Sequence, residues 1–163
     1  MPRAFRASFP GMIRRAGLFS VVLPVLLAAS FAAAPVALAQ TRDYTIVPGE
    51  RVGPIEIGMS GMQLLAAVGP PDTMLMQGTD TLYSWGTLTA RVNDMTGVVD
   101  ITLNDPGYQT QGRIHVGSAE LAVTAMMGQP SKRSTTGGLV TLGYAGMDVV
   151  ERNATVMQIR VHK

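Results

Sequence analysis

The sequence contains no cysteine and only two histidines, His115 and His162. The absence of cysteine excludes disulfide bonds, thiol nucleophiles and thiolate metal ligands. An ordinary metal site needs three or four Cys, His or carboxylate ligands, and the sequence assembles no such set. The hydrophobic core must therefore hold the fold together alone, and we expect neither a metal nor a cofactor.

Aromatic residues and charge are distributed unevenly along the chain. Four of the 13 basic residues and all four phenylalanines precede residue 40, whereas all 11 acidic residues follow it. Residues 40–163 therefore carry a net charge of −2 and five aromatic residues. Nucleic acids and anionic membrane surfaces bind clustered Lys and Arg, so neither is expected as a partner.

The N-terminal segment has the three-part layout of an export signal. A basic stretch up to Arg15 is followed by an apolar stretch over residues 16–34 and by the small-residue sequence Ala37-Leu38-Ala39. This layout predicts a signal peptide over residues 1–39, cleaved after Ala39 by the general secretory route. An uncleaved membrane anchor is the alternative, because the apolar stretch approaches the roughly 20 residues that span a bilayer.

Cleavage after Ala39 has two consequences for the mature protein. It leaves no stable membrane span, and no cysteine stands at the cleavage site to receive a lipid. The expected location is therefore periplasmic or secreted.

The rest of the chain contains an internal repeat at an offset of 59 residues. Identical residues occupy five matching positions: Ile55/Ile114, Gly58/Gly117, Ala66/Ala125, Gly69/Gly128 and Pro71/Pro130. The offset continues to Trp85/Tyr144, and core packing is the favoured interpretation of both aromatic rings. The pattern predicts a first unit over residues 40–112, which includes an N-terminal extension, and a second over residues 113–163.

Each predicted unit begins with a short helix. Ser60 and Ser118 are the predicted N-caps, and Gln63 completes a capping box with Ser60. Gly69 and Gly128 are predicted at the helix C-termini, because glycine adopts positive φ without steric cost.

After each helix the apolar period changes to two residues, which predicts three antiparallel strands. The strands of the first unit are expected near residues 81–85, 88–93 and 98–104, and those of the second near 139–144, 147–152 and 156–162. The residues expected to face the helices are Leu88, Ala90, Val92, Val99, Ile101 and Leu103, then Met147, Val149, Met157, Ile159 and Val161. The predicted fold class is α+β, with two tandem helix-plus-three-strand units in two layers.

A family resemblance supports this interpretation. The string Gly58-Met59-Ser60, the following Leu64-Leu65 and Val68-Gly69, and the strand Gly97–Leu103 resemble the SmpA/OmlA (BamE-like) group of small envelope proteins. The doubling is similar to that of the β-lactamase inhibitory proteins. The resemblance implies an exported binding or scaffold module. The chain departs from both groups, since it lacks the lipidated cysteine of the first and the disulfides of the second.

No residue pattern indicates catalysis. Ser60 and Ser118 are accounted for as helix caps, and no Ser or Thr is paired with a base and an orienting group. We therefore expect a non-enzymatic protein that binds another envelope protein; its oligomeric state is left open. A small-molecule or cell-wall-ligand binder, with a pocket between the two units, is the alternative. For a protein partner, the groove between the units around Tyr108 is the second candidate site.

The strand alternation predicts where a partner would bind. Side chains opposite the core-facing ones form the second face of each sheet, and an ordinary solvated face is the alternative interpretation. The predicted partner-binding residues are Arg91, Asp100, Thr102, Arg152, Gln158 and Arg160.

Overall fold

The structure is a computed structural model that describes residues 43–163. These residues belong to one compact unit, Ala39–Lys163. The predicted signal peptide and its cleavage site lie outside the described residues.

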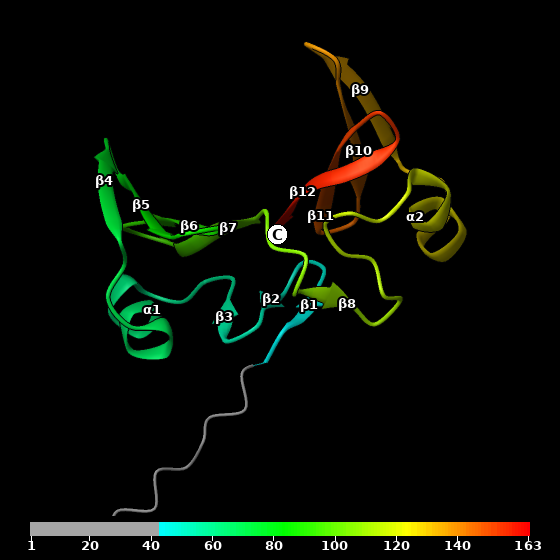
Figure 1. Ribbon diagram of the computed structural model, residues 1–163. Coiled ribbons are helices and arrows are strands. Elements are labelled where there is room, and N and C mark those ends of the chain that lie inside the picture. Colours follow the sequence, from blue (N-terminus) through cyan, green and yellow to red (C-terminus); the bar gives the residue numbers. More distant parts are fainter. Residues whose placement is uncertain (1–42) are drawn as a thin grey trace, which may run out of the picture. The chain divides into compact units, whose positions relative to one another are not determined.

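The larger of two sheets contains eight antiparallel strands in the order β4-β5-β6-β7-β12-β11-β10-β9 (Figure 1). Strands β7 and β12 are far apart in the sequence but pair at the centre, where Ile101 lies opposite Val161. This pairing joins the two halves into one sheet. In this spatial order the strands are Thr73–Gln77, Asp80–Trp85, Leu88–Asn93, Gly97–Leu103, Thr155–His162, Met147–Arg152, Leu139–Tyr144 and Lys132–Thr136.

The smaller sheet has the order β3-β2-β1-β8. Its strands are very short: Ile55–Glu56, Arg51–Val52, Thr45–Val47 and Gln109–Thr110. Strand β8 pairs with β1 in parallel, and the other pairs are antiparallel. Two helices of eight residues each complete the described part, α1 (Gly61–Val68) and α2 (Glu120–Met127).

The prediction of an α+β fold with two helix-plus-three-strand units is wrong. The described residues are mostly β, with twelve strands in two sheets and only two short helices. Strands β4 and β9 were missed because all five residues of each are exposed. These two strands are defined by backbone pairing with β5 and β10. Their side chains show no alternation of buried and exposed residues from which a strand could be predicted.

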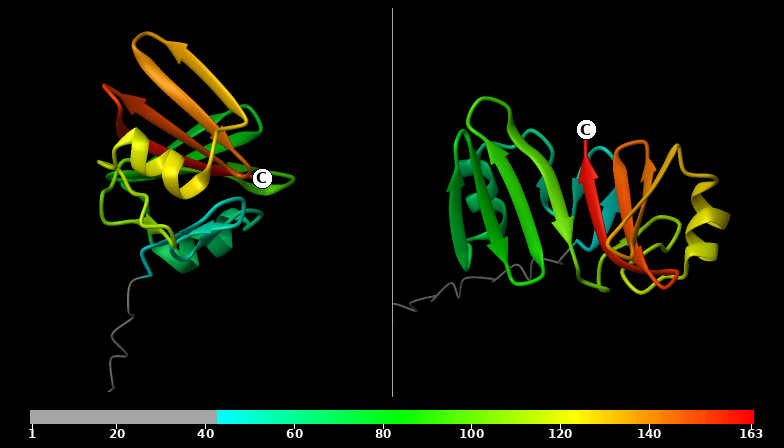
Figure 2. Two further views of the ribbon diagram at one scale, coloured as in Figure 1. Left: turned by 90° about the vertical axis from the view of Figure 1, so that its right-hand side faces the viewer. Right: turned by 90° about the horizontal axis from the view of Figure 1, so that it is seen from above.

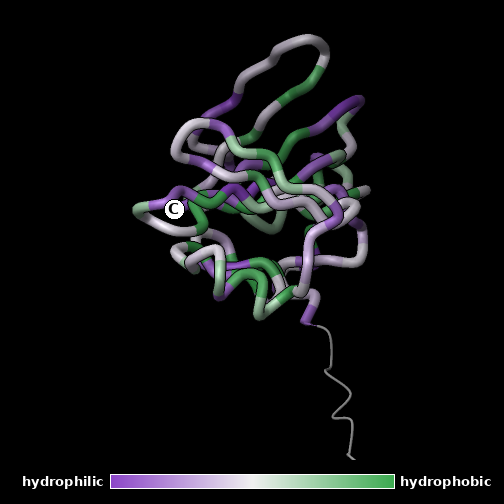
Figure 3. Tube along the Cα trace, turned by 90° about the vertical axis from the view of Figure 1, so that its left-hand side faces the viewer, coloured by the Kyte–Doolittle hydropathy of each residue, from purple (hydrophilic) through white to green (hydrophobic). Residues whose placement is uncertain are grey.

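Both helices and the smaller sheet lie on one face of the eight-stranded sheet. Leu64 of α1, Val123 of α2 and Ile46 of β1 are buried in the same core as the inward side chains of β6, β7, β11 and β12. Figure 2 shows the other face, which we call the open face, without a covering layer. Polar and apolar segments alternate along the strands in Figure 3, as expected for a sheet with one buried face.

Two predicted core residues do not face the core. Val98 is buried in place of Val99, and Val156 in place of Met157, which is 48% exposed. The register shifts between Arg91 and Val92 and between Val150 and Glu151 on the neighbouring strands. A β-bulge places one extra residue in β7 and in β12 at these points, which reverses the alternation there.

The helix ends agree with the sequence at three of four positions. Ser60 and Gln63 form the predicted capping box, and Gly69 and Gly128 are the C-cap residues with φ of 93° and 80°. The prediction for Ser118 is wrong, because Ala119 is the N-cap of α2 and makes no side-chain cap bond. The Oγ of Ser118 instead accepts a hydrogen bond from the backbone N of His115 at 3.0 Å.

Trp85 and Tyr144 join the strands to the helix ends. The indole Nε1 of Trp85 donates to the carbonyl oxygen of Gly69 at 3.2 Å, and the hydroxyl of Tyr144 donates to that of Gly128 at 3.4 Å. Both rings are partly buried against the core, in agreement with the interpretation as packing residues.

Candidate protein-binding face

A shallow hollow lies at the centre of the open face, over strands β5, β6, β7 and β12. Its volume is about 360 Å³. The strands that form it are held by backbone pairing on both sides, so its side chains stand on a rigid support. The hollow is lined by Leu82, Thr89, Arg91, Asp100, Thr102, Asn104, Gln158 and Arg160.

The structure brings five of the six predicted site residues together in this hollow: Arg91, Asp100, Thr102, Gln158 and Arg160. Cross-strand pairing explains the grouping, because Arg91 lies opposite Asp100 and Thr102 lies opposite Arg160. Arg152 is not part of the hollow. It is exposed at the end of β11, where it pairs with Thr155 beside the hairpin turn.

Arg91 is held by two carboxylates. Its Nε donates to Oδ2 of Asp100 at 2.7 Å, and its Nη1 donates to Oδ2 of Asp80 at 2.9 Å. These interactions, with Asp100 contributing most, raise the pKa of Arg91. Asn93 donates to Oδ1 of Asp80 at 2.7 Å and, together with Arg91, lowers the pKa of that carboxyl group. The position and charge of Arg91 are therefore fixed by the protein itself.

Arg160 differs from Arg91 in its surroundings. It pairs across the sheet with Thr102 on one side and with Asp148 on the other. Asp148 lies closer to His162, with 3.6 Å between Oδ1 and Nε2. Within residues 43–163 no ion pair is formed by Arg160, so this cation on the open face can receive an acidic group.

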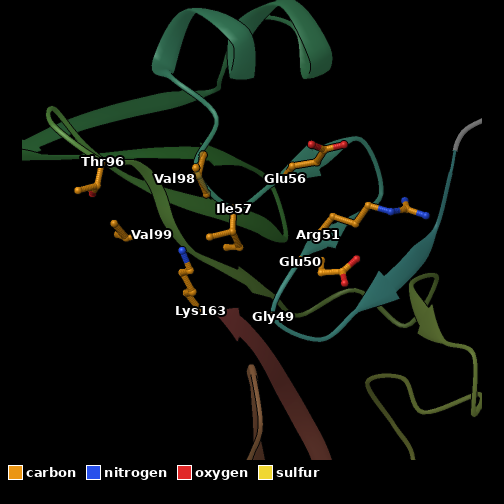
Figure 4. Close-up of a pocket in the computed structure, with 10 residues that line it drawn as sticks. Gly49, Glu50, Arg51, Glu56, Ile57, Thr96, Val98, Val99 and Lys163 are labelled. Carbon is orange, nitrogen blue, oxygen red and sulfur yellow. The ribbon is translucent and has the colours of Figure 1, made fainter.

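A larger hollow of about 680 Å³ lies beside the smaller sheet (Figure 4). Its charged residues do not converge on one point. The side chains of Lys163, Glu50 and Glu56 point in different directions in Figure 4. Arg51 is already hydrogen-bonded to the carbonyl oxygen of Gly53 at 3.0 Å. This arrangement gives a small charged ligand no common point of attachment.

The predicted groove around Tyr108 contains a packed aromatic pair. The ring of Tyr108 lies edge-on against Tyr44 with the centroids 5.2 Å apart. A separate hollow of about 630 Å³ is lined by parts of β1, β8 and α2, including Arg113 and Met126. The rings of Tyr44 and Tyr108 do not line it.

Glu151 is an unusual residue that the sequence analysis missed. Its side chain is fully buried on the core face, and its carboxyl group lies beside that of Glu120. Burial, and secondarily the negative charge of Glu120, raise the pKa of Glu151 to about 7. The sequence carries a signal for this burial, because Glu151 continues the series of inward-facing residues Met147 and Val149.

Residues 43–163 contain no group of three or more His, Asp or Glu side chains placed to hold a metal ion. The hydroxyl groups in the hollow, from Thr89 and Thr102, have no histidine beside them among its lining residues. In the same range, neither helix has the length and apolar character needed to cross a membrane.

Comparison with known proteins finds structures of similar fold but does not assign the chain to a family. No family model matches the chain. An extracellular protein containing a SCP domain, from Bacillus anthracis, is similar with a TM-score of 0.50 and 10% identity over 66% of this chain. The chain spans only 44% of that protein's length. A DUF4309 family protein (YjgB) of Bacillus subtilis is similar with a TM-score of 0.53 and 14% identity, over 70% of this chain and 87% of that one.

Neither of these proteins is described as a SmpA/OmlA or β-lactamase inhibitory protein. The resemblance noted in the sequence therefore remains an expectation that rests on its motifs. At these identities the similarity concerns the fold alone.

Proposed function

We propose that the protein is an exported, non-enzymatic binding module that docks another protein of the cell envelope on its open sheet face. The observation that carries the proposal is that two arginines of the open face differ: Arg91 is fixed by ion pairs within the protein, whereas Arg160 is not. Arg91 and Asp100 form an ion pair held in place by Asp80, and beside it Arg160 has no ionic partner among the described residues.

The chemistry of the hollow indicates the kind of group that would bind. The clamped Arg91 contributes directed polar contacts, while Arg160 offers a positive charge. We expect the partner to present a carboxylate to Arg160 and neutral polar groups to Thr102 and Gln158. Such charge complementarity provides orientation and discrimination between partners more than raw affinity.

The position of the hollow on a broad sheet face favours a protein partner over a small substrate. Its volume of about 360 Å³ lies near the lower end of the range of small-molecule sites, which extends from about 300 to 1,000 Å³. It opens from a broad sheet face and could receive one anchoring side chain within a larger contact. The lining residues also contain no nucleophile paired with a base.

Two observations support export. The predicted signal peptide over residues 1–39 directs the chain to the secretory route. One of the two similar structures belongs to an extracellular protein.

Affinity capture from the envelope fraction with the purified exported protein tests the proposal. We expect Arg160→Glu to abolish capture of the specific partner while the protein stays folded, with a small fall in melting temperature because the new carboxylate lies opposite Asp148. Arg152→Glu is the matched control, since this exposed arginine lies outside the hollow, and it should capture normally. Unchanged capture by Arg160→Glu would overturn the proposal. A melting temperature raised by small envelope metabolites, with no protein captured, would instead support the alternative of a small-ligand binder.

A further inference from the structure

The eight-stranded sheet has two free edges of different chemistry. Strand β4 forms one edge and β9 forms the other, and all five residues of each are exposed. An edge strand presents unpaired backbone N–H and C=O groups that can pair with another strand. The side chains on each edge decide whether such pairing is favourable.

Strand β9 carries charged side chains, which proteins use to prevent an edge strand from pairing with another strand. It contains Lys132 and Arg133, and Arg133 is ion-paired with Glu120 of α2. Pairing with a second strand would remove water from these cations, which is costly.

Strand β4 has no such protection. Its sequence, Thr-Met-Leu-Met-Gln, contains no charge, and Met74, Leu75 and Met76 are 60%, 56% and 74% exposed. Met74 pairs with Tyr83 and therefore points to the helix-covered face, while Leu75 pairs with Leu82 and points to the open face. Each face of this edge thus carries at least one exposed apolar side chain and no charge.

The end of the sheet next to β4 exposes further apolar side chains. Helix α1 leads directly into β4 and contributes Met62, 83% exposed, and Leu65. Methionine side chains are flexible and suit a surface that must adapt to a neighbour.

We propose that β4 pairs antiparallel with β4 of a second copy of this chain. The strand is self-complementary about Leu75: Met74 would lie opposite the second copy's Met76, and Thr73 opposite its Gln77. Of the three possible edge pairings, β4 with β9 would bring cations against methionines, and β9 with β9 would bring cations together. Only β4 with β4 avoids both costs, and its two-fold symmetry closes the assembly as a dimer.

The dimer would place both open faces on the same side. Two identical antiparallel strands in one sheet are related by a two-fold axis perpendicular to the sheet, so the sheet continues across the junction. This consequence rests on the proposed function, since it would present two binding faces side by side. The dimer itself does not depend on that function.

Single-cysteine variants provide the first test, because the wild-type chain has no cysteine to interfere. In the proposed dimer the two copies of Leu75 face each other at a separation within the range that a disulfide can bridge. We expect Leu75→Cys to form a covalent dimer under mild oxidation. The control Ser134→Cys, at the centre of β9, should remain monomeric on a denaturing gel. Failure of Leu75→Cys to cross-link would contradict the proposal, as would equal cross-linking of the control.

Sedimentation over a concentration series provides the second test. We expect the wild-type protein to have the mass of a dimer, and Leu75→Lys and Met76→Lys to have the mass of a monomer while retaining the fluorescence of Trp85. Ser134→Lys should remain dimeric. A wild-type protein that stays monomeric throughout would overturn the proposal. Growing oligomers suppressed by Ser134→Lys would instead show pairing of β4 with β9.

Discussion

Arg91 on β6 lies directly opposite Asp100 on β7, and its Nε donates a hydrogen bond of 2.7 Å to Oδ2 of that carboxylate. The alternation of side chains along the strands predicts that both residues lie on the open face, but it does not predict the bond between them. The structure shows a bonded pair, so a change at Arg91 alters the face itself as well as any contact with a partner. Arg160 is the cleaner position at which to test binding.

The Arg91 pair leads to a prediction about stability. Arg91→Glu would place three carboxylates together, since Asp100 and Asp80 both contact this side chain. We expect a clear fall in melting temperature, because like charges on neighbouring strands repel. Arg91→Met, which removes the charge and keeps the aliphatic part, should cause a smaller fall. Equal melting temperatures for both variants and the wild type would show that the pair contributes nothing.

Glu151 leads to a prediction about pH. Burial raises its pKa from 4.5 to about 7 in the folded protein, so between these values the folded state binds more protons than the unfolded state. Stability contributed by the protonated group is complete below pH 4.5 and is lost as the pH rises through about 7. The slope from one such group is at most about 1.4 kcal/mol per pH unit.

Urea unfolding from pH 5 upward measures this effect. Glu151→Gln should abolish the fall in stability, because the amide does not ionise. Glu120→Gln is the companion variant: it removes a negative charge beside Glu151 and so lowers the pKa of Glu151, which should make the fall smaller and end it at a lower pH. A wild-type profile that matches Glu151→Gln would show that the carboxyl group does not titrate in this range.

The helix C-termini lead to a prediction about glycine. Gly69 has φ 93° and ψ −173°, and Gly128 has φ 80° and ψ −166°, a region that only glycine adopts readily. No atom lies within 4 Å of the Cβ that a substitution would add, so any cost comes from the backbone alone. We expect Ala and Asn at either position to lower the free energy of unfolding by roughly 1–3 kcal/mol. Asn would rescue stability if the backbone were in the ordinary left-handed region, and such rescue would contradict this explanation.

Much of the sheet was predictable because its inner strands alternate in burial. The hairpins over β6–β7 and β11–β12 and the polar face they share follow from that pattern. The bulges could not be predicted from this pattern. The extra residues Val99 and Met157 are apolar and fit the alternation of their strands, so only the register of the paired strands reveals them. The edge strands β4 and β9 also escaped, because backbone pairing defines them and their side chains are all exposed.

The candidate site was predictable as a set of residues but not as an arrangement. Alternation identifies Thr102 and Arg160 as outward-facing, yet only the pairing of β7 with β12 places them opposite each other. The pairing joins strands far apart in the sequence, which no local pattern specifies. For the same reason the sequence could not distinguish Arg152, at the end of β11, from the residues of the hollow.

Photo-cross-linking in the producing cell tests the central claim most directly. A photoreactive residue at Gln158, in the hollow of the open face, is compared with one at Ile57, in the larger hollow beside the smaller sheet. The proposed function predicts a discrete protein adduct from Gln158, lost when Arg160→Glu is added, and none from Ile57. An adduct from Ile57 with none from Gln158 would contradict the assignment of the open face as the binding surface.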